Sequence, residues 1–229
     1  MYWQRIFFDI GKKVVNTKHR LIHTRMEFLT ESYLVQRDTQ WPRKGSHILA
    51  QYTDSYVVVY QAFNPQIATF AVENQRFGGK FSFERMSWIK TNFLWMMYRC
   101  GWASKINQER VLAIYLKRSA FDEILSQAYT AQEQKKAGLD EISVRLQWDP
   151  DHDPHGAKEE RRAIQLGLKG EVLHKYATEW ILKIEDVTDF VHDQSQILKT
   201  NQIEELRTAK EAAYPVTDTK TAQLIGVDL

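Results

Sequence analysis

The chain contains little cysteine, glycine or proline, and each shortage excludes a class of protein. Cys100 is the single cysteine among 229 residues, so there is no internal disulfide and no cysteine-rich zinc site. This usage fits a reducing compartment, and we expect a cytoplasmic location. With 10 glycines, 5 prolines and 43% hydrophobic residues, the composition is typical of a chain with a sizeable core, not of a disordered or repetitive protein.

Long hydrophobic runs are also missing. The tryptophan-rich segment holds only six uncharged residues in a row, FLWMMY, between Lys90 and Arg99. A bilayer-spanning helix needs roughly 20 apolar residues, so we expect no membrane partner. The stretch 1–25 carries six Lys or Arg against one acid and lacks the order of a secretory signal. A mitochondrial presequence stays open for this stretch, and so does a true start at Met26.

The common catalytic motifs are absent as well. The chain has no Gly-rich phosphate loop of either common type, and no G-x-S-x-G, H-E-x-x-H or C-x-x-C. The sequence FGGK at 77–80 is a weak signal by itself. We expect Cys100 in the core, and structural roles for His47 and His174, because neither histidine has an evident catalytic partner. Catalytic residues and cofactors are therefore unknown at this level.

What is present is an uneven charge distribution behind a net charge of only +2. Residues 76–118 contain nine Lys or Arg against two acids, whereas residues 119–160 contain four against ten, and residues 171–229 six against eleven. A local positive field attracts phosphates and other anions. The alternative is that this basic face pairs with the acidic segments inside the fold.

Strand and helix patterns are mixed without a regular βαβ rhythm, which predicts the α+β class. We expect one domain over 31–198, in which helices flank a curved or barrel-like mixed sheet. An N-terminal extension (1–30) would precede it, and a C-terminal helix and loose tail (199–229) would follow. Strands are expected at 47–63 (two strands around a turn at 53–55), 109–118, 142–148, 162–168 and 181–187, and helices at 65–76, 84–100, 119–138, 170–180 and from 188 onward.

Helix starts are predicted from capping residues. Asn64 followed by Pro65 is a strong N-terminal signal, because the Asn side chain caps a backbone N–H and Pro tolerates the first helical position. Ser82 is a candidate cap for the helix over 84–100, and Ser119 for the helix that Gly138 would end.

The segment RMSWIKTNFLWMMYRCGWASK (85–105) is the most aromatic and basic part of the chain. Wound as a helix, it places apolar residues on one face. Tryptophans recur every seven residues on the other, beside Arg99. Such a face is typical of a wall that stacks a base and binds its phosphates. Two alternatives remain open, namely that both faces are buried or that the face is a protein-interaction surface.

Polar residues in predicted strands and aromatic surroundings form our candidate ligand site, because buried polar groups are paired or face a cavity. Several arginines beside tryptophans and tyrosines are suited to a nucleotide or polyanion. The predicted site residues are Tyr60, Gln61, Arg76, Arg85, Trp88, Lys90, Trp95, Arg99, Trp102, Lys105, Arg145, Gln147, Arg162 and Gln165.

The sequence WDPDHDPHG (148–156) is the one candidate metal segment. Alternating aspartates and two histidines offer hard oxygen and imidazole ligands. An EF-hand is excluded, because Pro154 stands where the calcium loop requires glycine. A looser divalent site, and with it a metal-dependent hydrolase, remains an alternative. The competing interpretation is a turn stabilised by Asp and Pro, and we assign no metal ligand.

Four blocks carry a resemblance to a known family. HILAQYTDSYVVVYQAFNPQIA, FSFERMSWIKTNFLWMMYRCGWASKINQERVLAIYLKR, VRLQWDPDHDP and RRAIQLGLKGEVL occur in this order within about 45–195. Together they resemble the domain of unknown function 4291 family. Thr91 stands where the family usually has proline, and Cys100 where it usually has serine. The resemblance implies a compact soluble domain and no activity.

Our functional hypothesis is a soluble protein that binds a nucleotide or single-stranded nucleic acid. Arg85, Lys90, Arg99 and Lys105 would meet phosphates, and a tryptophan would stack a base. If the protein is an enzyme, group transfer fits better than hydrolysis, because no nucleophile–base pair is evident. One version is an ADP-ribosyltransferase-like use of NAD. The oligomeric state is not predicted.

Overall fold

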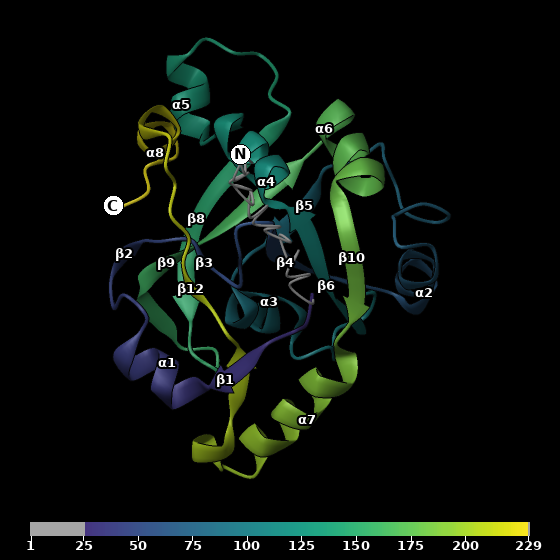
Figure 1. Ribbon diagram of the computed structural model, residues 1–229, viewed down its shortest axis with the longest axis vertical. Helices are drawn as coiled ribbons and strands as arrows, with labels where there is room; N and C mark the ends of the chain where they lie inside the picture. The colour runs from purple at the N-terminus through teal and green to yellow at the C-terminus, as the bar shows by residue number, and fades with distance from the viewer. Residues whose placement is uncertain (1–25, 229) are drawn as a thin grey trace, which may run out of the picture.

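The computed structural model describes residues 26–228 (Figure 1). Most of the extension predicted over 1–30 therefore lies outside the described residues. The strands are β1 (Thr30–Ser32), β2 (Gly45–Ser46), β3 (Leu49–Ala50), β4 (Tyr56–Phe63), β5 (Ser87–Lys90), β6 (Arg110–Lys117), β7 (Ala128–Tyr129), β8 (Val144–His152), β9 (Lys158–Leu168), β10 (Ile181–Asp186), β11 (Arg207–Ala209) and β12 (Ala212–Ala213). The helices are α1 (Tyr33–Thr39), α2 (Pro65–Asn74), α3 (Phe93–Cys100), α4 (Arg118–Ser126), α5 (Ala131–Lys136), α6 (Gly170–Lys175), the π-helix η1 (Tyr176–Trp180), α7 (Thr188–Lys199), the 3-10 helix η2 (Ile203–Glu205) and α8 (Thr219–Ile225).

A mixed eight-stranded sheet forms the centre of the molecule and confirms the predicted α+β class. Its strand order is β10-β6-β4-β5-β9-β8-β7, with β2 paired to β9. Pairing is antiparallel except for β2 with β9 and β7 with β8. The sheet is open, with β10 and β7 at its ends, so the barrel-like form of the prediction is wrong. No helix among the described residues is long and apolar enough to cross a membrane.

The central strands are buried on both faces, as their unbroken apolar runs predict. Along β4, Val57 and Val59 belong to one hydrophobic cluster, and Val58 and Tyr60 to the other. The first cluster packs under α2, α4, α6 and α8, and the second under α1, α3 and α7. In Figure 1, α1 and α7 lie at one end of the molecule and α5, α6 and α8 at the other. Each face of the sheet is therefore covered by a hydrophobic cluster and the helices packed on it.

Local signals correctly predicted the start of β4 and of α2. The turn before β4 is closed by a hydrogen bond from Thr53 N–H to Tyr56 O (2.9 Å). The Asn64 side chain accepts from Ile67 N–H at 3.0 Å, with Pro65 as the first residue of α2. Both predictions depended only on neighbouring residues, and both are confirmed.

The helix predicted over 84–100 is confirmed only for residues 93–100, which form α3, and is wrong for the residues before them. Residues 87–90 form β5, and α3 begins only after Asn92, whose side chain accepts from Trp95 N–H at 2.6 Å. Ser82 caps no helix. The reason is tertiary, because β5 pairs with β9 through Ile89 opposite Leu166. Strand pairing overrides a periodicity that suits a helix.

Two other helix predictions need correction. The helix predicted over 119–138 is two helices, α4 and α5, separated by β7, and Thr130 caps the second one. Ser119 caps neither of them. Residues 170–180 are helical as predicted, but the second half is the π-helix η1. These segments are mostly helical, as predicted. The length of each helix is set by its packing on the sheet.

The segment after residue 199 is not a loose tail. β11 pairs with β1, and β12 pairs with β3. Tyr214, Val216 and Ile225 are buried in the first hydrophobic cluster. In Figure 1 this segment runs along the length of the molecule to α8. At the other end of the chain, Phe28, which we assigned to the extension, packs against Tyr60. The described ends of the chain are thus part of the packed structure.

Candidate functional site

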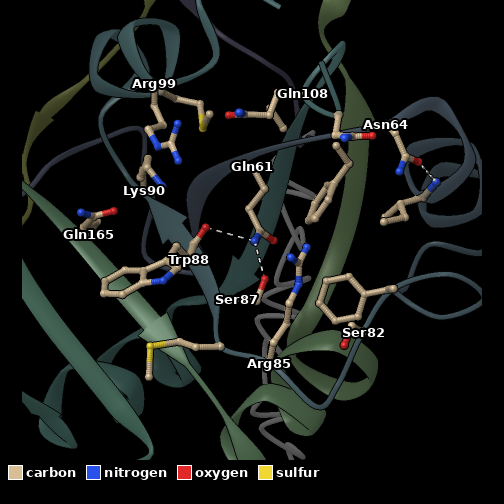
Figure 2. Close-up of a pocket in the computed structure, with 17 residues that line it drawn as sticks. Gln61, Asn64, Ser82, Arg85, Ser87, Trp88, Lys90, Arg99, Gln108 and Gln165 are labelled. Atoms are coloured by element: carbon tan, nitrogen blue, oxygen red, sulfur yellow. Dashed lines mark hydrogen bonds between the residues drawn. The ribbon is translucent and has the colours of Figure 1, made fainter. Parts of the chain in front are cut away.

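A pocket of about 580 Å³ opens where β4 and β5 separate (Figure 2). The two strands pair only at Tyr60 and Lys90. Beyond this point the Gln61 side chain fills the gap, and its amide nitrogen donates to Ser87 Oγ at 2.8 Å and to Trp88 O at 3.1 Å. Its amide oxygen accepts from the Tyr176 hydroxyl at 2.6 Å. Gln61 therefore holds the strands apart and forms the floor of the pocket.

The pocket lining is polar and basic, and it contains no carboxylate. It combines three cationic side chains, five amides, two serines and several apolar or aromatic residues. The lining residues are Gln61, Ala62, Phe63, Asn64, Ile67, Phe81, Ser82, Arg85, Met86, Ser87, Trp88, Lys90, Met96, Arg99, Asn107, Gln108 and Gln165. A ligand in this space meets hydrogen-bond donors and positive charge.

The three cations enter from different elements. Arg85 belongs to the loop before β5, Lys90 ends β5, and Arg99 lies in the last turn of α3. In Figure 2 the guanidinium groups of Arg85 and Arg99 point toward the middle of the pocket from opposite sides. None of the three forms an ion pair or donates a side-chain hydrogen bond to another described residue. Their donors are therefore available to a ligand.

Lys90 is the least exposed of these cations. Only 5% of its surface is accessible, although its side chain lines the pocket. Burial, assisted by the nearby positive charge of Arg99, lowers the pKa of Lys90 to about 8, and Asp149 opposes this shift. Such an amine is partly neutral in mildly alkaline solution, and an anion beside it favours the protonated form.

Trp88 supplies an aromatic wall, and a glycine makes room for it. Trp88 stands opposite Gly167 in the pairing of β5 with β9. A Cβ on Gly167 would lie 3.0 Å from Trp88 Cε2 and would also collide with the Met86 side chain. Because Gly167 has no side chain, the indole can lie over β9. The wall therefore depends on a residue outside the pocket.

The structure brings six of the predicted site residues together around this pocket. They are Gln61, Arg85, Trp88, Lys90, Arg99 and Gln165. Gln147 is adjacent, since its amide oxygen accepts from Gln165 at 2.9 Å, but it lies outside the lining.

The other predicted site residues lie elsewhere. Tyr60 is fully buried in the second cluster, and its hydroxyl has no hydrogen-bond partner among the described residues. Trp95 is buried and stacks on His152. Lys105 donates to the carbonyl of Arg99 at 2.8 Å and so caps α3. Arg145 donates to Gln134, and Arg76 and Arg162 are exposed away from the pocket.

Trp102 belongs to a second groove. This groove has a volume of about 730 Å³ and lies between the loop after α3, the turn at Pro154 and α7. The Trp102 indole donates to Pro154 O at 3.3 Å. The three tryptophans predicted on one helical face thus occupy three separate environments. The interaction surface that we considered over 85–105 does not exist as one face.

Seven lining residues with polar or sulfur-containing side chains were not predicted as site residues. They are Asn64, Ser82, Met86, Ser87, Met96, Asn107 and Gln108. Asn64 and Ser82 were assigned only capping roles, and the others lie in loops, on β5 or on α3 without a motif. They reach the pocket only because the tertiary fold places their segments beside one another.

The aspartates of 148–156 are held by protein groups rather than gathered into a metal site. Asp149 accepts from Gln165 at 2.5 Å, Asp151 accepts from Arg161 at 2.7 Å, and Asp153 accepts from Ala157 N–H at 2.8 Å. No group of three His, Cys, Asp or Glu suited to a metal occurs among the described residues. The segment is the end of β8 and its turn into β9, which agrees with the Asp/Pro turn interpretation.

A buried polar cluster beside the start of α3 was also not predicted. Glu211 accepts from Phe93 N–H at 2.6 Å, and burial raises the pKa of Glu211 well above its usual range. Asn92 lies between the carboxylates of Glu211 (3.5 Å) and Asp151 (3.4 Å). Burial also raises the pKa of Asp151, while Arg161 opposes that shift. The cluster anchors the C-terminal segment to α3, and none of its residues lines the pocket.

The structure is thus an α+β domain with a pocket lined by three cationic side chains. The family model described as Domain of unknown function (DUF4291) matches residues 47–214, and the chain belongs to that family. This confirms the resemblance drawn from the four sequence blocks. No curated protein matches the chain.

Proposed function

We propose that the pocket binds a nucleotide or a single-stranded nucleic acid. The observation that carries the proposal is the set of Arg85, Lys90 and Arg99 around one cavity without a carboxylate in its lining. Lys90 is buried without an ion pair, and a buried cation is normally paired because an unpaired charge is costly to desolvate; Arg85 and Arg99 are exposed and reach the same cavity. A phosphate supplies the missing negative charge and accepts bidentate hydrogen bonds from arginine.

The neutral part of the lining supports a base beside the phosphate. Trp88, which is only partly buried, offers a flat apolar face on which a base can stack. Amides such as Asn107 and Gln108 carry both donors and acceptors, which suits the edge of a base. The volume of about 580 Å³ lies in the range of small-molecule sites.

We propose binding and no reaction at this pocket. An ADP-ribosyl transfer develops an oxocarbenium ion, which a carboxylate ordinarily stabilises in glycosyl chemistry. The described pocket lining supplies no carboxylate, and it holds no nucleophile–base pair. Group transfer would therefore require the ligand or a partner to supply the missing group.

Tryptophan fluorescence tests the proposal. Short single-stranded RNA, NAD and ATP are titrated at low and high salt into the wild-type protein and the Trp88→Phe and Arg85→Met variants. We expect quenching that Trp88→Phe largely removes, and binding that Arg85→Met weakens about tenfold. RNA affinity should fall steeply with salt, because bound cations release counterions.

Arg162→Met is the matched control, since it removes an exposed arginine outside the pocket. It should bind like the wild type. If no ligand changes the fluorescence of the folded protein, or if Arg162→Met weakens binding as much as Arg85→Met, the pocket is not the binding site.

A further inference from the structure

Lys90 differs from the two arginines by its burial. It ends β5 between Tyr60 of β4 and Gln165 of β9, which are its neighbours in the sheet. Its side chain is almost inaccessible except through the pocket. The described residues offer no acceptor to its ammonium group. A ligand group that reaches this end of the pocket therefore meets an ammonium that needs an anion.

The groups around Lys90 do not supply the anion that its ammonium group needs. From α3 it faces Arg99, a second cation, and the Cys100 thiol, whose pKa burial raises, so that the thiol stays neutral. The Tyr60 hydroxyl is neutral for the same reason, since burial raises its pKa well above the usual value. From β8, Asp149 contributes the only nearby negative charge among the described residues, and it already accepts from Gln165 at 2.5 Å.

The two cations match one kind of phosphate better than another. A terminal phosphate carries about two negative charges near neutral pH, and it has three oxygens free to accept hydrogen bonds. An internal phosphodiester carries one charge, has two free oxygens and continues as a chain on both sides. A group that reaches the buried Lys90 side chain must leave the surface, and a chain end does so more readily than a continuous strand.

Building on the proposed function, we infer that Lys90 and Arg99 form a subsite for a terminal phosphate dianion, and that Lys90 takes up a proton when the dianion binds. The ligand is then a nucleoside monophosphate or the phosphorylated end of a single strand. An internal phosphodiester is not its natural occupant.

The pH dependence follows from the charges. In the empty pocket the pKa of Lys90 is about 8, and a bound dianion raises it. Below about 8 the amine is already protonated, so affinity there is flat down to roughly 6, where the phosphate itself gains a proton. Above about 8, binding must first protonate the amine, and affinity falls by up to tenfold per pH unit.

Calorimetry in two buffers of different ionisation enthalpy measures this proton uptake directly. The ligands are adenosine 5′-monophosphate, adenosine and the diester dinucleotide adenylyl-3′,5′-adenosine, with the uridine series alongside. We expect the monophosphates to bind best. Their affinity should fall about tenfold from pH 7 to pH 9, with nearly one proton taken up at pH 9.

Two variants distinguish the effect of a positive charge at position 90 from the effect of its protonation equilibrium. Lys90→Arg keeps a permanent charge, so binding should persist without the alkaline fall or the proton uptake. Lys90→Met removes the charge in an apolar side chain that suits the buried site. It should weaken monophosphate binding more than tenfold and leave it independent of pH above 7.

Arg99→Met tests the electrostatic effect of Arg99 on Lys90. The measured quantity is the pH at which affinity begins to fall, which would not change if Arg99 had only a structural role. Removing the cation beside Lys90 raises the pKa of Lys90, so the alkaline fall in affinity should begin at a higher pH. Arg162→Met again serves as the control and should leave the whole profile unchanged.

The outcomes distinguish this inference from the proposed function. Equal affinity for the dinucleotide and the monophosphate, without proton uptake, overturns the terminal-phosphate subsite and leaves nucleotide binding in place. A monophosphate preference without proton uptake overturns the role given to Lys90. If the folded wild-type protein binds none of these ligands, the proposed function fails as well.

Discussion

At the scale of single residues, burial acts on two ionisable groups in opposite directions. It lowers the pKa of Lys90 and raises the pKa of Glu211, and both shifts disfavour the charged form. The difference lies in their surroundings. Lys90 faces a pocket, whereas Glu211 is enclosed and holds the Phe93 N–H at the start of α3. One group is therefore assigned to ligand binding and the other to stability.

The raised pKa of Glu211 makes a prediction about stability and pH. Because the folded state holds this proton more tightly than the unfolded state, the contribution is fully present below about 4.5. It is lost as pH rises through the folded pKa. Glu211→Gln keeps an acceptor for Phe93 N–H but cannot ionise. Its free energy of unfolding relative to the wild type should therefore rise between pH 5 and pH 8.

Urea unfolding at both pH values measures this difference. Glu211→Ala is the comparison, and it should be about 2–4 kcal/mol less stable than Glu211→Gln at either pH, because neither variant ionises and the alanine leaves a cavity and an unpaired backbone donor. A constant gap between wild type and Glu211→Gln would mean that folding does not raise the pKa of Glu211.

At the scale of elements, β10 illustrates how an exposed sheet edge is protected. The Gln75 side chain pairs with the strand as a neighbouring backbone would, accepting from Ile184 N–H at 2.8 Å and donating to Ile184 O at 3.0 Å. Gln75 ends α2 with a φ of 54°. A residue other than glycine in this conformation costs about 1–2 kcal/mol, which these hydrogen bonds offset.

Two substitutions at Gln75 separate these effects. Gln75→Ala loses both hydrogen bonds to Ile184 and the one that the same amide donates to Val72 O at 2.7 Å, and it keeps the backbone strain, so it should destabilise the protein by about 1–3 kcal/mol. Gln75→Gly loses the same bonds but relieves the strain, and it should be about 1 kcal/mol less destabilising. Denaturant unfolding gives both values, and light scattering should detect increased association through the uncovered edge. Equal stability of the two variants would show that the backbone conformation stores no strain.

At the scale of the whole molecule, the C-terminal segment completes both hydrophobic clusters. Leu206 and Ala209 belong to the second cluster, and Tyr214, Val216 and Ile225 to the first. The segment therefore crosses between the two layers instead of trailing from one of them. We expect the folded protein to depend on it.

A pair of isoleucines tests this dependence. Ile225 in α8 is 1% exposed, whereas Ile106 in the loop after α3 is 84% exposed. Ile225→Ala should lower the free energy of unfolding by about 2–5 kcal/mol, and Ile106→Ala by less than about 0.5 kcal/mol. Chemical denaturation of both variants gives the comparison. A small loss for Ile225→Ala would mean that the segment is held only weakly.

The sequence by itself determined those features that neighbouring residues control. The Val57–Val59 run made a strand buried on both faces, and Asn64 with Pro65 started a helix, because capping and side-chain burial act over a few residues. The order of strand and helix patterns along the chain also indicated the α+β class, and the positions of the charged residues showed the concentration of positive charge in 76–118.

Only the tertiary structure decided how the site is assembled. Trp88 and Lys90 are part of a strand because β9 pairs with them. The seven-residue spacing of Trp88, Trp95 and Trp102 by itself suits a helix. The pocket unites residues from β4, β5, α3 and β9 with the loops between them, and its gap exists because β4 and β5 separate. Such proximity depends on contacts between residues far apart in the chain. Local periodicity carries no information about those contacts.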